Sequence, residues 1–382
     1  MPSEFPTSDR IVDDAPGLYV HVPFCVRKCP YCAFASGPGL ARAGEWADGI
    51  RREAALRADP SGRPFATLYV GGGTPSALPP VVLATALAWL HDGPGLAPDA
   101  ERTIEVNPGD VTPDTAAAWR ATGFDRASLG VQALDDPTLS FLGRRHDAAT
   151  ARAAFAWLRA AGFDNIGIDL IYGVPGRDEA RWRDTLAAAL ALGPDHVSCY
   201  ALTIEPDTPF AQAVASGRMP SPDDDRVADL FLAADAVLAS AGFDHYEVSN
   251  WARPGRRARH NARYWSGAPW LGLGPAAHAF DGRTRRWNAP DLDGWLAGLV
   301  PGAAPTGGSE TPAPAQRALE NLALGLRTSD GIAPEAVSTR AAADGTLARL
   351  LADDLLRRRD GRLVPTPRGM LVADAMARAL SD

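Results

Sequence analysis

Short runs of aliphatic and β-branched residues alternate with longer, Ala-rich amphipathic segments over the first two thirds of the chain. The apolar runs predict six strands, over residues 18–22, 67–70, 102–107, 126–131, 165–171 and 196–202. The segments between them predict helices, including 45–58, 81–91 and 113–122. Strands that alternate with helices in this way are typical of βα units around a parallel sheet.

A short repeat supports the same architecture. Four similar tripeptides stand between an Ala-rich segment and an apolar run, the last of them before residues 245–248: Gly123-Phe124-Asp125, Gly162-Phe163-Asp164, Gly193-Pro194-Asp195 and Gly242-Phe243-Asp244. We expect each glycine to end a helix in a left-handed conformation. The predicted fold class is α/β, an incomplete (β/α)6 barrel with its site at the C-terminal ends of the strands.

The last quarter of the chain has a different pattern. Residues 303–308 mix Ala, Pro, Thr and Gly and predict a linker. Helices are expected over 315–325, 334–343, 346–357 and 367–379, with a hairpin turn at Asp360-Gly361 and a strand over 362–365. We therefore predict a tail at 1–16, the barrel at 17–245, a connecting region at 246–302 and a small helical, winged-helix-like domain at 303–382.

Composition narrows the function classes. The 382 residues fit a barrel-sized domain plus a small one, and the net charge of −8 argues against a nucleic-acid binder. Three of the four cysteines lie close together, so we expect no disulfide framework and a reducing cytoplasm. No run of about 18 apolar residues predicts a membrane span, and nothing indicates a peripheral membrane contact. The N-terminal segment is acidic and lacks the basic region followed by an apolar region that is typical of a signal peptide.

The cysteine array carries the strongest chemical signal. Cys25, Cys29 and Cys32 form a C-x₃-C-x₂-C pattern directly after the first predicted strand. Three thiolates can converge on one metal centre, and they would leave one iron of a [4Fe–4S] cluster without a protein ligand. The alternatives are unligated buried thiols or a zinc knuckle, for which His21 is the only nearby fourth ligand.

Further unusual residues follow the later strands. Gly71-Gly72-Gly73-Thr74-Pro75 ends the second strand and allows a ligand to approach the backbone closely. Glu105 and Gln132 end the third and fourth strands, and Arg144 follows. Asp169 interrupts an apolar strand, where an ionised carboxylate needs a partner or a ligand.

This combination resembles the radical S-adenosylmethionine (SAM) superfamily, and within it the oxygen-independent coproporphyrinogen III oxidases and the related HemW heme chaperones. The resemblance extends over nearly the whole chain. It implies that the three cysteines bind a [4Fe–4S] cluster and that SAM occupies the open iron. It also implies SAM contacts from Tyr19, Tyr31, Gly72, Gly73, Thr74, Glu105, Gln132, Arg144 and Asp169.

Three features favour the chaperones over the oxidases. The oxidases carry a fourth cysteine where this chain has Phe34, and they have a long N-terminal arm where only eighteen residues precede Tyr19. The pattern H-N-x-x-Y-W, formed by His260, Asn261, Tyr264 and Trp265, matches the one associated with heme binding in HemW proteins. One departure is Ala33, where the chaperones commonly have an acid.

The heme motif also has a plainer interpretation, a surface loop with solvated arginines (Arg253, Arg256, Arg257 and Arg259) beside a packed Tyr-Trp pair. His278, in a Gly-rich segment, is a secondary candidate. The sequence-based hypothesis is a cytoplasmic heme chaperone that binds a [4Fe–4S] cluster, SAM and heme and delivers heme to respiratory hemoproteins. The alternatives are an oxygen-independent coproporphyrinogen decarboxylase and, less favoured, a redox-sensing regulator that binds DNA through Arg357, Arg358 and Arg359.

Overall fold

The computed structural model describes residues 15–57, 62–91, 93–301 and 307–381. Most of the predicted tail and of the predicted linker lie outside the described residues. The larger part of the chain is organised by one twelve-stranded sheet, in the order β12-β11-β10-β9-β1-β2-β3-β4-β5-β6-β8-β7.

Six consecutive strands pair in parallel and confirm the predicted barrel. They are β1 (Gly17–Val22), β2 (Phe65–Gly72), β3 (Leu96–Val106), β4 (Arg126–Gln132), β5 (Asn165–Tyr172) and β6 (His196–Ala201). Each predicted strand is present, although β3 begins six residues earlier than its apolar run. The glycines of the four tripeptides all have positive φ, as expected for helix ends.

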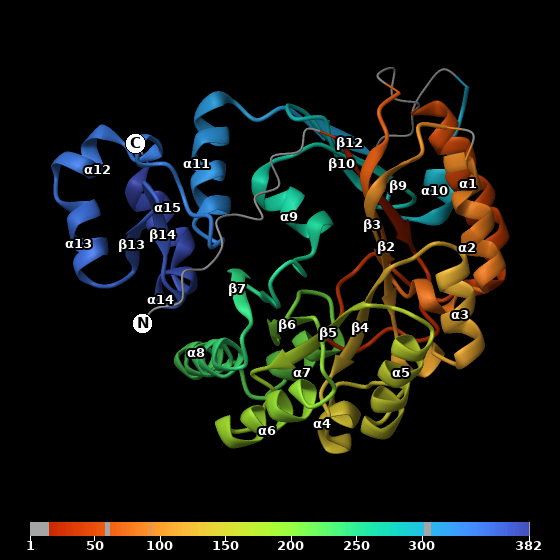
Figure 1. Cartoon of the computed structure of the whole chain (residues 1–382), viewed down its shortest axis with the longest axis horizontal. Helices are drawn as coiled ribbons and strands as arrows, with labels where there is room; N and C mark the ends of the chain where they lie inside the picture. Colours follow the sequence, from red (N-terminus) through yellow and green to blue (C-terminus); the bar gives the residue numbers. More distant parts are fainter. Residues whose placement is uncertain (1–14, 58–61, 92, 302–306, 382) are drawn as a thin grey trace.

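Helices cover the outer surface of this curved sheet (Figure 1). They are α1 (Ala43–Leu56), α2 (Pro80–Leu87), α3 (Pro113–Ala121), α5 (Ala148–Ala160), α6 (Glu179–Leu190) and α8 (Asp224–Ser240). Two shorter helices, α4 (Asp136–Phe141) and α7 (Pro209–Ala215), pack together in a smaller hydrophobic cluster. Short 3₁₀ turns complete the connections: η1 (Leu40–Arg42), η2 (Pro75–Ala77), η3 (Ala88–His91) and η4 (Pro108–Asp110).

The segment predicted as a connecting region supplies strands to both edges of the sheet. On one side, β9 (Trp270–Leu273) pairs in parallel with β1, and β10 (His278–Phe280), β11 (Arg285–Trp287) and β12 (Gly308–Glu310) follow antiparallel. On the other side, β8 (Asn250–Ala252) pairs antiparallel with β6 and with β7 (Asp244–Glu247). Two further helices belong to this segment, α9 (Arg259–Ser266) and α10 (Leu292–Ala297).

The strand after the fourth tripeptide lies outside the six parallel strands. The fourth tripeptide leads into β7, but β7 does not begin another parallel unit. Only two residues separate β7 from β8, and a link this short permits antiparallel pairing alone. The repeat identified a strand correctly but did not determine its direction in the sheet.

The C-terminal domain combines helices with one hairpin, as expected, and Figure 1 shows it beside the barrel. Its elements are α11 (Pro314–Gly325), η5 (Pro334–Ala336), α12 (Thr339–Ala343), α13 (Thr346–Ala352), β13 (Leu356–Arg359), β14 (Arg362–Pro365), α14 (Pro367–Leu371) and α15 (Ala373–Leu380). The prediction of a helix over 346–357 is wrong at its end. Arg357 lies on β13, because the Asp360-Gly361 turn draws this segment into the hairpin.

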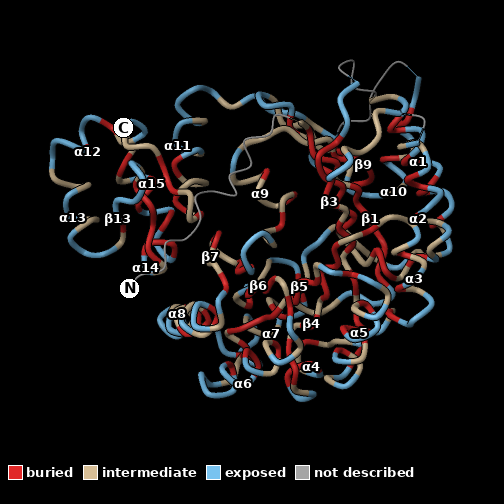
Figure 2. Tube along the Cα trace, in the orientation of Figure 1, coloured by how far each residue is buried: buried red, intermediate tan, exposed pale blue. Residues whose placement is uncertain are grey.

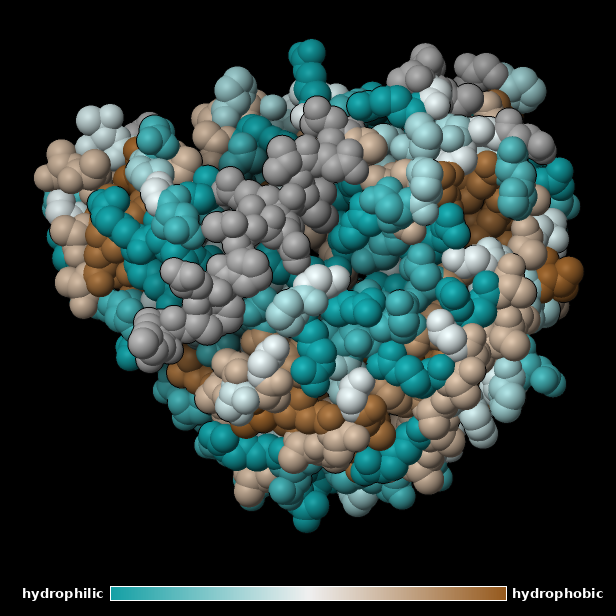
Figure 3. All heavy atoms as spheres, in the orientation of Figure 1, coloured by the Kyte–Doolittle hydropathy of each residue, from teal (hydrophilic) through white to brown (hydrophobic). Residues whose placement is uncertain are grey.

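The main hydrophobic core lies between the sheet and its outer helices (Figure 2). Leu18, Val20 and Val22 of β1 face this core and are fully buried, whereas Tyr19 and His21 alternate with them and face the inside of the barrel. The same alternation makes the interior of the barrel polar. On the face of the molecule shown in Figure 3, hydrophobic residues form a band in the lower part of the view and smaller groups elsewhere among hydrophilic ones. In the part of the chain that the structure describes, every helix is too short or too polar to span a membrane.

A buried carboxylate fastens α1 to the edge of the sheet. Glu53 is fully buried, and its Oε1 accepts hydrogen bonds from Arg57 Nε at 2.7 Å and Asn288 Nδ2 at 2.8 Å. Its Oε2 accepts from the Gly274 backbone N–H at 2.8 Å and from Trp295 Nε1 at 2.9 Å. These four donors satisfy a charge that would otherwise be costly to bury.

We predict that Glu53→Ala lowers the free energy of unfolding by about 3–5 kcal/mol, because it removes the buried carboxylate that accepts hydrogen bonds from Arg57, Asn288, Gly274 and Trp295. Urea denaturation followed by circular dichroism measures the change. Glu45→Ala on the same helix is the control, since its partner Arg42 is exposed, and it should leave the transition midpoint almost unchanged. Equal midpoints for the two variants would contradict the assignment.

Candidate metal and cofactor site

The three cysteines lie on a loop that follows β1 at the C-terminal end of the barrel. This cysteine loop, residues 25–37, is closed by backbone hydrogen bonds from Cys25 N to Gly37 O at 2.8 Å and from Gly37 N to Pro23 O at 3.0 Å. Inside it, Cys32 N donates to Cys29 O at 3.1 Å. Cys25 is buried, whereas Cys29 and Cys32 are half-buried. The loop therefore holds three thiols in one small region.

The glycine turn, Gly71-Gly72-Gly73-Thr74-Pro75, runs alongside the start of the cysteine loop. Gly73 N donates to Val22 O and Thr74 N donates to Phe24 O, both at 2.7 Å. The Thr74 hydroxyl donates to the Cys25 sulfur at 3.3 Å. The turn thus brings a hydroxyl donor to one of the cysteines.

This close approach requires glycine. A Cβ on Gly73 would lie 2.5 Å from the Phe24 carbonyl oxygen, and one on Gly72 would lie 2.5 Å from the His21 ring. Gly72 also has a φ of 108°, a conformation that residues with a side chain rarely adopt. The glycines are therefore needed for packing between β1 and β2, and they also allow a ligand to approach the backbone of the glycine turn.

The arrangement disfavours zinc. His21 accepts a hydrogen bond from the Tyr19 hydroxyl at Nδ1 and donates from Nε2 to Ala35 O, both at 2.9 Å, so both ring nitrogens are engaged. Among the residues that the structure describes, no three His, Cys, Asp or Glu side chains are close enough to hold a single metal ion.

Donors for sulfur ligands surround the loop. Arg144 Nη1 donates to the Cys29 sulfur at 3.3 Å, and its Nη2 donates to Gly130 O at 3.0 Å. Tyr31 forms hydrogen bonds with both Cys29 and Arg144. Hydrogen bonds to cysteine sulfurs are one of the means by which proteins set the potential of a cluster.

Glu105 lies at the end of β3, opposite the glycine turn. Its Oε1 accepts from the Tyr69 hydroxyl at 2.8 Å and its Oε2 accepts from Gly72 N at 3.0 Å. Burial raises the pKa of the Glu105 carboxyl to about 7, although the hydrogen bond from Tyr69 opposes that rise. A cationic ligand placed here would favour the ionised carboxylate.

Asp169 is stabilised by hydroxyl donors rather than by an ion pair. The Ser128 hydroxyl lies 3.0 and 3.2 Å from its two carboxylate oxygens, and Ser198 also donates to it. Burial raises the pKa of Asp169, with these hydrogen bonds opposing. The polar interruption of β5 therefore has partners, and it faces the inside of the barrel with Glu105.

Gln132 ends β4 in a strained conformation. Its φ is 66°, and the pairing of β4 with β5 shifts register between Gly130 and Gln132. A Cβ on Gly130 would lie 3.0 Å from the Gln132 amide nitrogen and 3.5 Å from Arg144 Nη2. Such a left-handed residue at a strand end is common at functional sites, and it places the Gln132 amide near Arg144.

The heme motif lies on α9 and not on a surface loop, which was its plainer interpretation. His260 is fully buried on the inner side of the barrel. Its Nδ1 lies 2.8 Å from the Thr67 hydroxyl, its Nε2 lies 2.9 Å from the Tyr264 hydroxyl, and its ring stacks on Tyr69 with centroids 5.2 Å apart. Burial lowers the pKa of His260 to about 3. Iron ligation by His260 would require one of these two hydrogen bonds to break.

The remaining motif residues are less closely connected. Asn261 and Trp265 are half-buried on α9, and among the described residues no hydrogen bond joins either to His260. The three arginines before α9 and Arg259, its first residue, contact the barrel or the C-terminal domain instead of clustering. Their partners are Pro194 O for Arg253, Asp164 for Arg256, Asp330 for Arg257, and Asp99 for Arg259.

Several residues of the site were missed by the sequence analysis. Tyr69 sits in an apolar run, and Ser128 and Ser198 are small residues within strands. The signal in the sequence was the alternation of side chains along each strand. Every second residue faces the inside of the barrel, and these positions carry polar side chains, such as Thr67 and Tyr69 on β2 or Thr103 and Glu105 on β3. Reading each strand with a period of two would have identified them.

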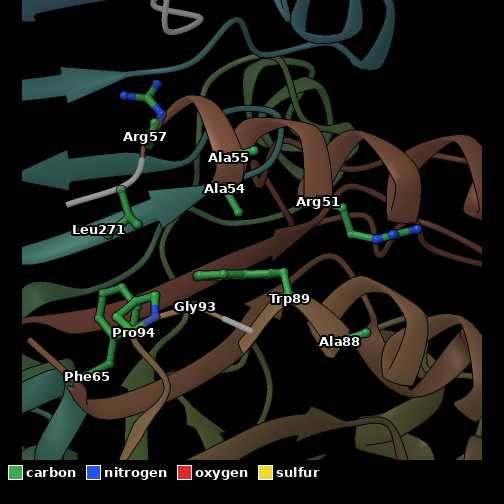
Figure 4. Close-up of a pocket in the computed structure, with 10 residues that line it drawn as sticks. All are labelled: Arg51, Ala54, Ala55, Arg57, Phe65, Ala88, Trp89, Gly93, Pro94 and Leu271. Atoms are coloured by element: carbon green, nitrogen blue, oxygen red, sulfur yellow. The ribbon is translucent and has the colours of Figure 1, made fainter. Parts of the chain in front are cut away.

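A separate cavity of about 320 Å³ lies on the helix side of β2. Figure 4 shows Trp89, Phe65, Pro94 and Leu271 around it, with Arg57 at one side. Arg57 is bonded to Glu53 and Asn288, and none of the predicted site residues lines this cavity. It is distinct from the candidate site.

Comparisons with known proteins agree with this architecture. A model of the radical SAM superfamily matches residues 19–189, and a model of the HemN C-terminal domain matches residues 313–372. A solved structure of coproporphyrinogen III oxidase (HemN) from Escherichia coli has a TM-score of 0.80, with 96% of this chain and 90% of that chain covered. Its sequence identity of 23% limits this likeness to the fold.

Two relatives are similar along most of their length. The heme chaperone HemW of Mycobacterium tuberculosis (strain H37Rv) is 40% identical over 370 residues, which cover 95% of this chain and 94% of that protein. The heme chaperone HemW of Synechocystis sp. (strain PCC 6803) is 37% identical over 330 residues, which cover 82% of this chain and 78% of that protein.

Proposed function

Since this chain belongs to the HemW family of the radical SAM superfamily, we propose that it is a heme chaperone that carries a [4Fe–4S] cluster and SAM. The main support is the cysteine loop, which offers three thiols and no fourth. The position where the oxidases carry a further cysteine holds Phe34, which is 64% exposed. The proposed setting is the cytoplasm, whose reducing conditions keep thiols available.

In this proposal Cys25, Cys29 and Cys32 hold the cluster, and SAM binds at the iron that they leave open. When bound, the cluster supplies an electron to the SAM sulfonium. Thr74 and Arg144 would donate hydrogen bonds to cysteine sulfurs and stabilise their negative charge.

The inner wall of the barrel would orient SAM. Glu105 and the backbone of Gly72 form one side of the site, and the ionised carboxylate attracts the ammonium group of SAM. Tyr19, hydrogen-bonded to His21, lies on the neighbouring strand. Gln132 and Asp169 offer an amide and a carboxylate for the remaining polar groups. Tyr31, packed against Phe210, covers the site from the side of the loop.

Heme would be the cargo, and heme-dependent respiratory proteins would be its acceptors. Two relatives named heme chaperones share 37–40% of their residues with this chain over most of its length. The net charge of −8 gives no support to a nucleic-acid partner.

One assay separates the chaperone from the decarboxylase. The reconstituted, reduced protein is incubated anaerobically with SAM and coproporphyrinogen III, and the porphyrins are analysed by chromatography. We expect no conversion to protoporphyrinogen, and in parallel an equimolar uptake of heme followed by its transfer to an apo-hemoprotein. Accumulation of protoporphyrinogen would reject the chaperone proposal in favour of the decarboxylase.

A second prediction tests the cluster. Cys29→Ser should lose most of the bound iron and sulfide, about four iron atoms per chain in the unsubstituted protein, because two thiolates hold a cluster poorly. Iron and acid-labile sulfide are measured after anaerobic reconstitution, with circular dichroism to verify folding. Cys199→Ala is the matched control, since Cys199 is buried in the core away from the loop. Equal iron contents in the two variants would refute the cluster assignment.

A third prediction concerns pH. Because the pKa of Glu105 is about 7, its ionised fraction rises about tenfold between pH 6 and pH 8, and SAM affinity should rise with it. Equilibrium binding of SAM measures this dependence. Glu105→Gln should bind more weakly and with a flatter pH profile, whereas an unchanged profile would assign the dependence to another group. The charged or titratable groups near Glu105 are Tyr19, Tyr69, Arg126, Asp169, Tyr200 and Tyr264.

A further inference from the structure

We propose that His278 is the axial ligand of the heme and that the heme binds against an aromatic face formed by Tyr264, Trp270, His278, Phe280 and Trp287. This inference rests on the proposed function and specifies where its cargo binds. The sequence motif associated the histidine of α9 with heme binding but left the axial ligand unassigned, with His278 as a secondary candidate.

The environments of the seven histidines favour His278. A histidine must offer a free, neutral ring nitrogen to coordinate iron. Five histidines have at least one ring nitrogen in a hydrogen bond or ion pair and are largely buried: His21, His146, His196, His245 and His260. His278 and His91 are exposed, and neither ring has a hydrogen-bond partner among the described residues. His91 also lacks an aromatic neighbour in the part of the chain that the structure describes.

The backbone holds His278 in a fixed position. It begins β10, and Gly272 of the neighbouring strand β9 approaches so closely that a Cβ there would lie 2.0 Å from the His278 carbonyl oxygen. Gly274 lies against His21, where a Cβ would be 2.5 Å from the carbonyl oxygen. The buried Glu53 accepts a hydrogen bond from Gly274 N. A histidine that is already held in position binds heme iron more tightly, because less conformational entropy is lost on binding.

The strand register gathers the aromatic residues on one side of the sheet. His278 lies opposite Trp287, and Phe280 lies opposite Trp270, so the four side chains point to the same face. The rings of His278 and Trp287 are stacked with centroids 5.9 Å apart, and those of Trp270 and Phe280 are 5.3 Å apart. Trp287 lies beside the imidazole, and the partly exposed rings of Trp270 and Trp287 suit an apolar macrocycle, whereas Phe280 is buried behind them.

Guanidinium groups border the same face. Arg317 and Arg285 lie over the Phe280 ring, 4.6 and 5.8 Å from its centroid. Both pair with Glu320, and Arg285 also pairs with Glu310. Heme carries two propionates, and Arg binds carboxylates through paired hydrogen bonds. Both arginines are already paired with glutamates, so the propionates of the heme would bind there by replacing Glu310 and Glu320 as partners of the guanidinium groups.

The aromatic face adjoins the proposed SAM site. Gly272 of β9 pairs with Tyr19 of β1, so His278 stands one strand away from the inner wall of the barrel. Tyr264 contacts Trp270 with ring centroids 4.8 Å apart, and its hydroxyl is bonded to His260. In this arrangement His260 is a positioning residue that orients Tyr264, and the H-N-x-x-Y-W motif contributes to heme binding without ligating iron.

The test is a titration of the full-length, cluster-loaded protein with ferric heme, followed by absorption and electron paramagnetic resonance spectra. We expect His278→Ala to weaken heme binding at least tenfold and to lose the spectrum of imidazole-ligated iron, with recovery of that spectrum on addition of free imidazole. His278→Tyr should bind heme with a different, high-spin spectrum. The matched control, His91→Ala, should behave like the unsubstituted protein.

His260→Ala separates the two candidate ligands. It should weaken heme binding but keep the spectrum of imidazole ligation, because His278 remains. An unchanged spectrum in His278→Ala, or loss of imidazole ligation in His260→Ala alone, would overturn the assignment. If the unsubstituted protein binds no heme at all, both the proposed function and the assignment of His278 are refuted. Cluster absorbance, measured in every variant, identifies any substitution that simply disrupts folding.

Discussion

The site depends on one contact between two backbone segments. Gly73 and Thr74 donate hydrogen bonds to Val22 O and Phe24 O, where the chain leaves β1 and enters the cysteine loop. These bonds fix the three thiols relative to the glycine turn, and Glu105 is fixed to the same turn through Gly72. A side chain at Gly73 would push the segments apart. The three cysteines and the Glu105 carboxylate are therefore both held in place by the glycine turn.

The interior of the barrel is polar because its strands alternate. Outward side chains such as Val20 and Leu18 form the core with the helices, while inward ones provide hydroxyl, carboxylate and imidazole groups. Buried polar groups of this kind need partners, and Tyr69, Ser128 and Thr67 supply them for Glu105, Asp169 and His260. The lumen is thus a network of hydrogen bonds whose open end faces the cysteine loop.

Much of this arrangement could be predicted from the sequence, because periodicity and local spacing carry the information. The six strands, the cysteine array and the residues at the strand ends were expected at the positions that the structure gives them. The direction of β7, the end of α13 and the pairing of β9 with β1 depend on contacts between distant segments, which no local pattern encodes. His260 and His278 illustrate the difference. Both are histidines beside aromatic residues in sequence, and only tertiary packing makes one inaccessible and leaves the other exposed.

The C-terminal domain is joined to the barrel by main-chain hydrogen bonds at the outer strand. Glu247 forms a bridge with Thr328, Val248 N donates to Arg327 O, and Ser329 N donates to Tyr246 O. An edge strand without such a cover is a template for association with other chains. The two domains therefore form one cooperative folding unit. A shortened chain that ends before the C-terminal helices would leave the edge strand β7 without its hydrogen-bond partners and would tend to aggregate.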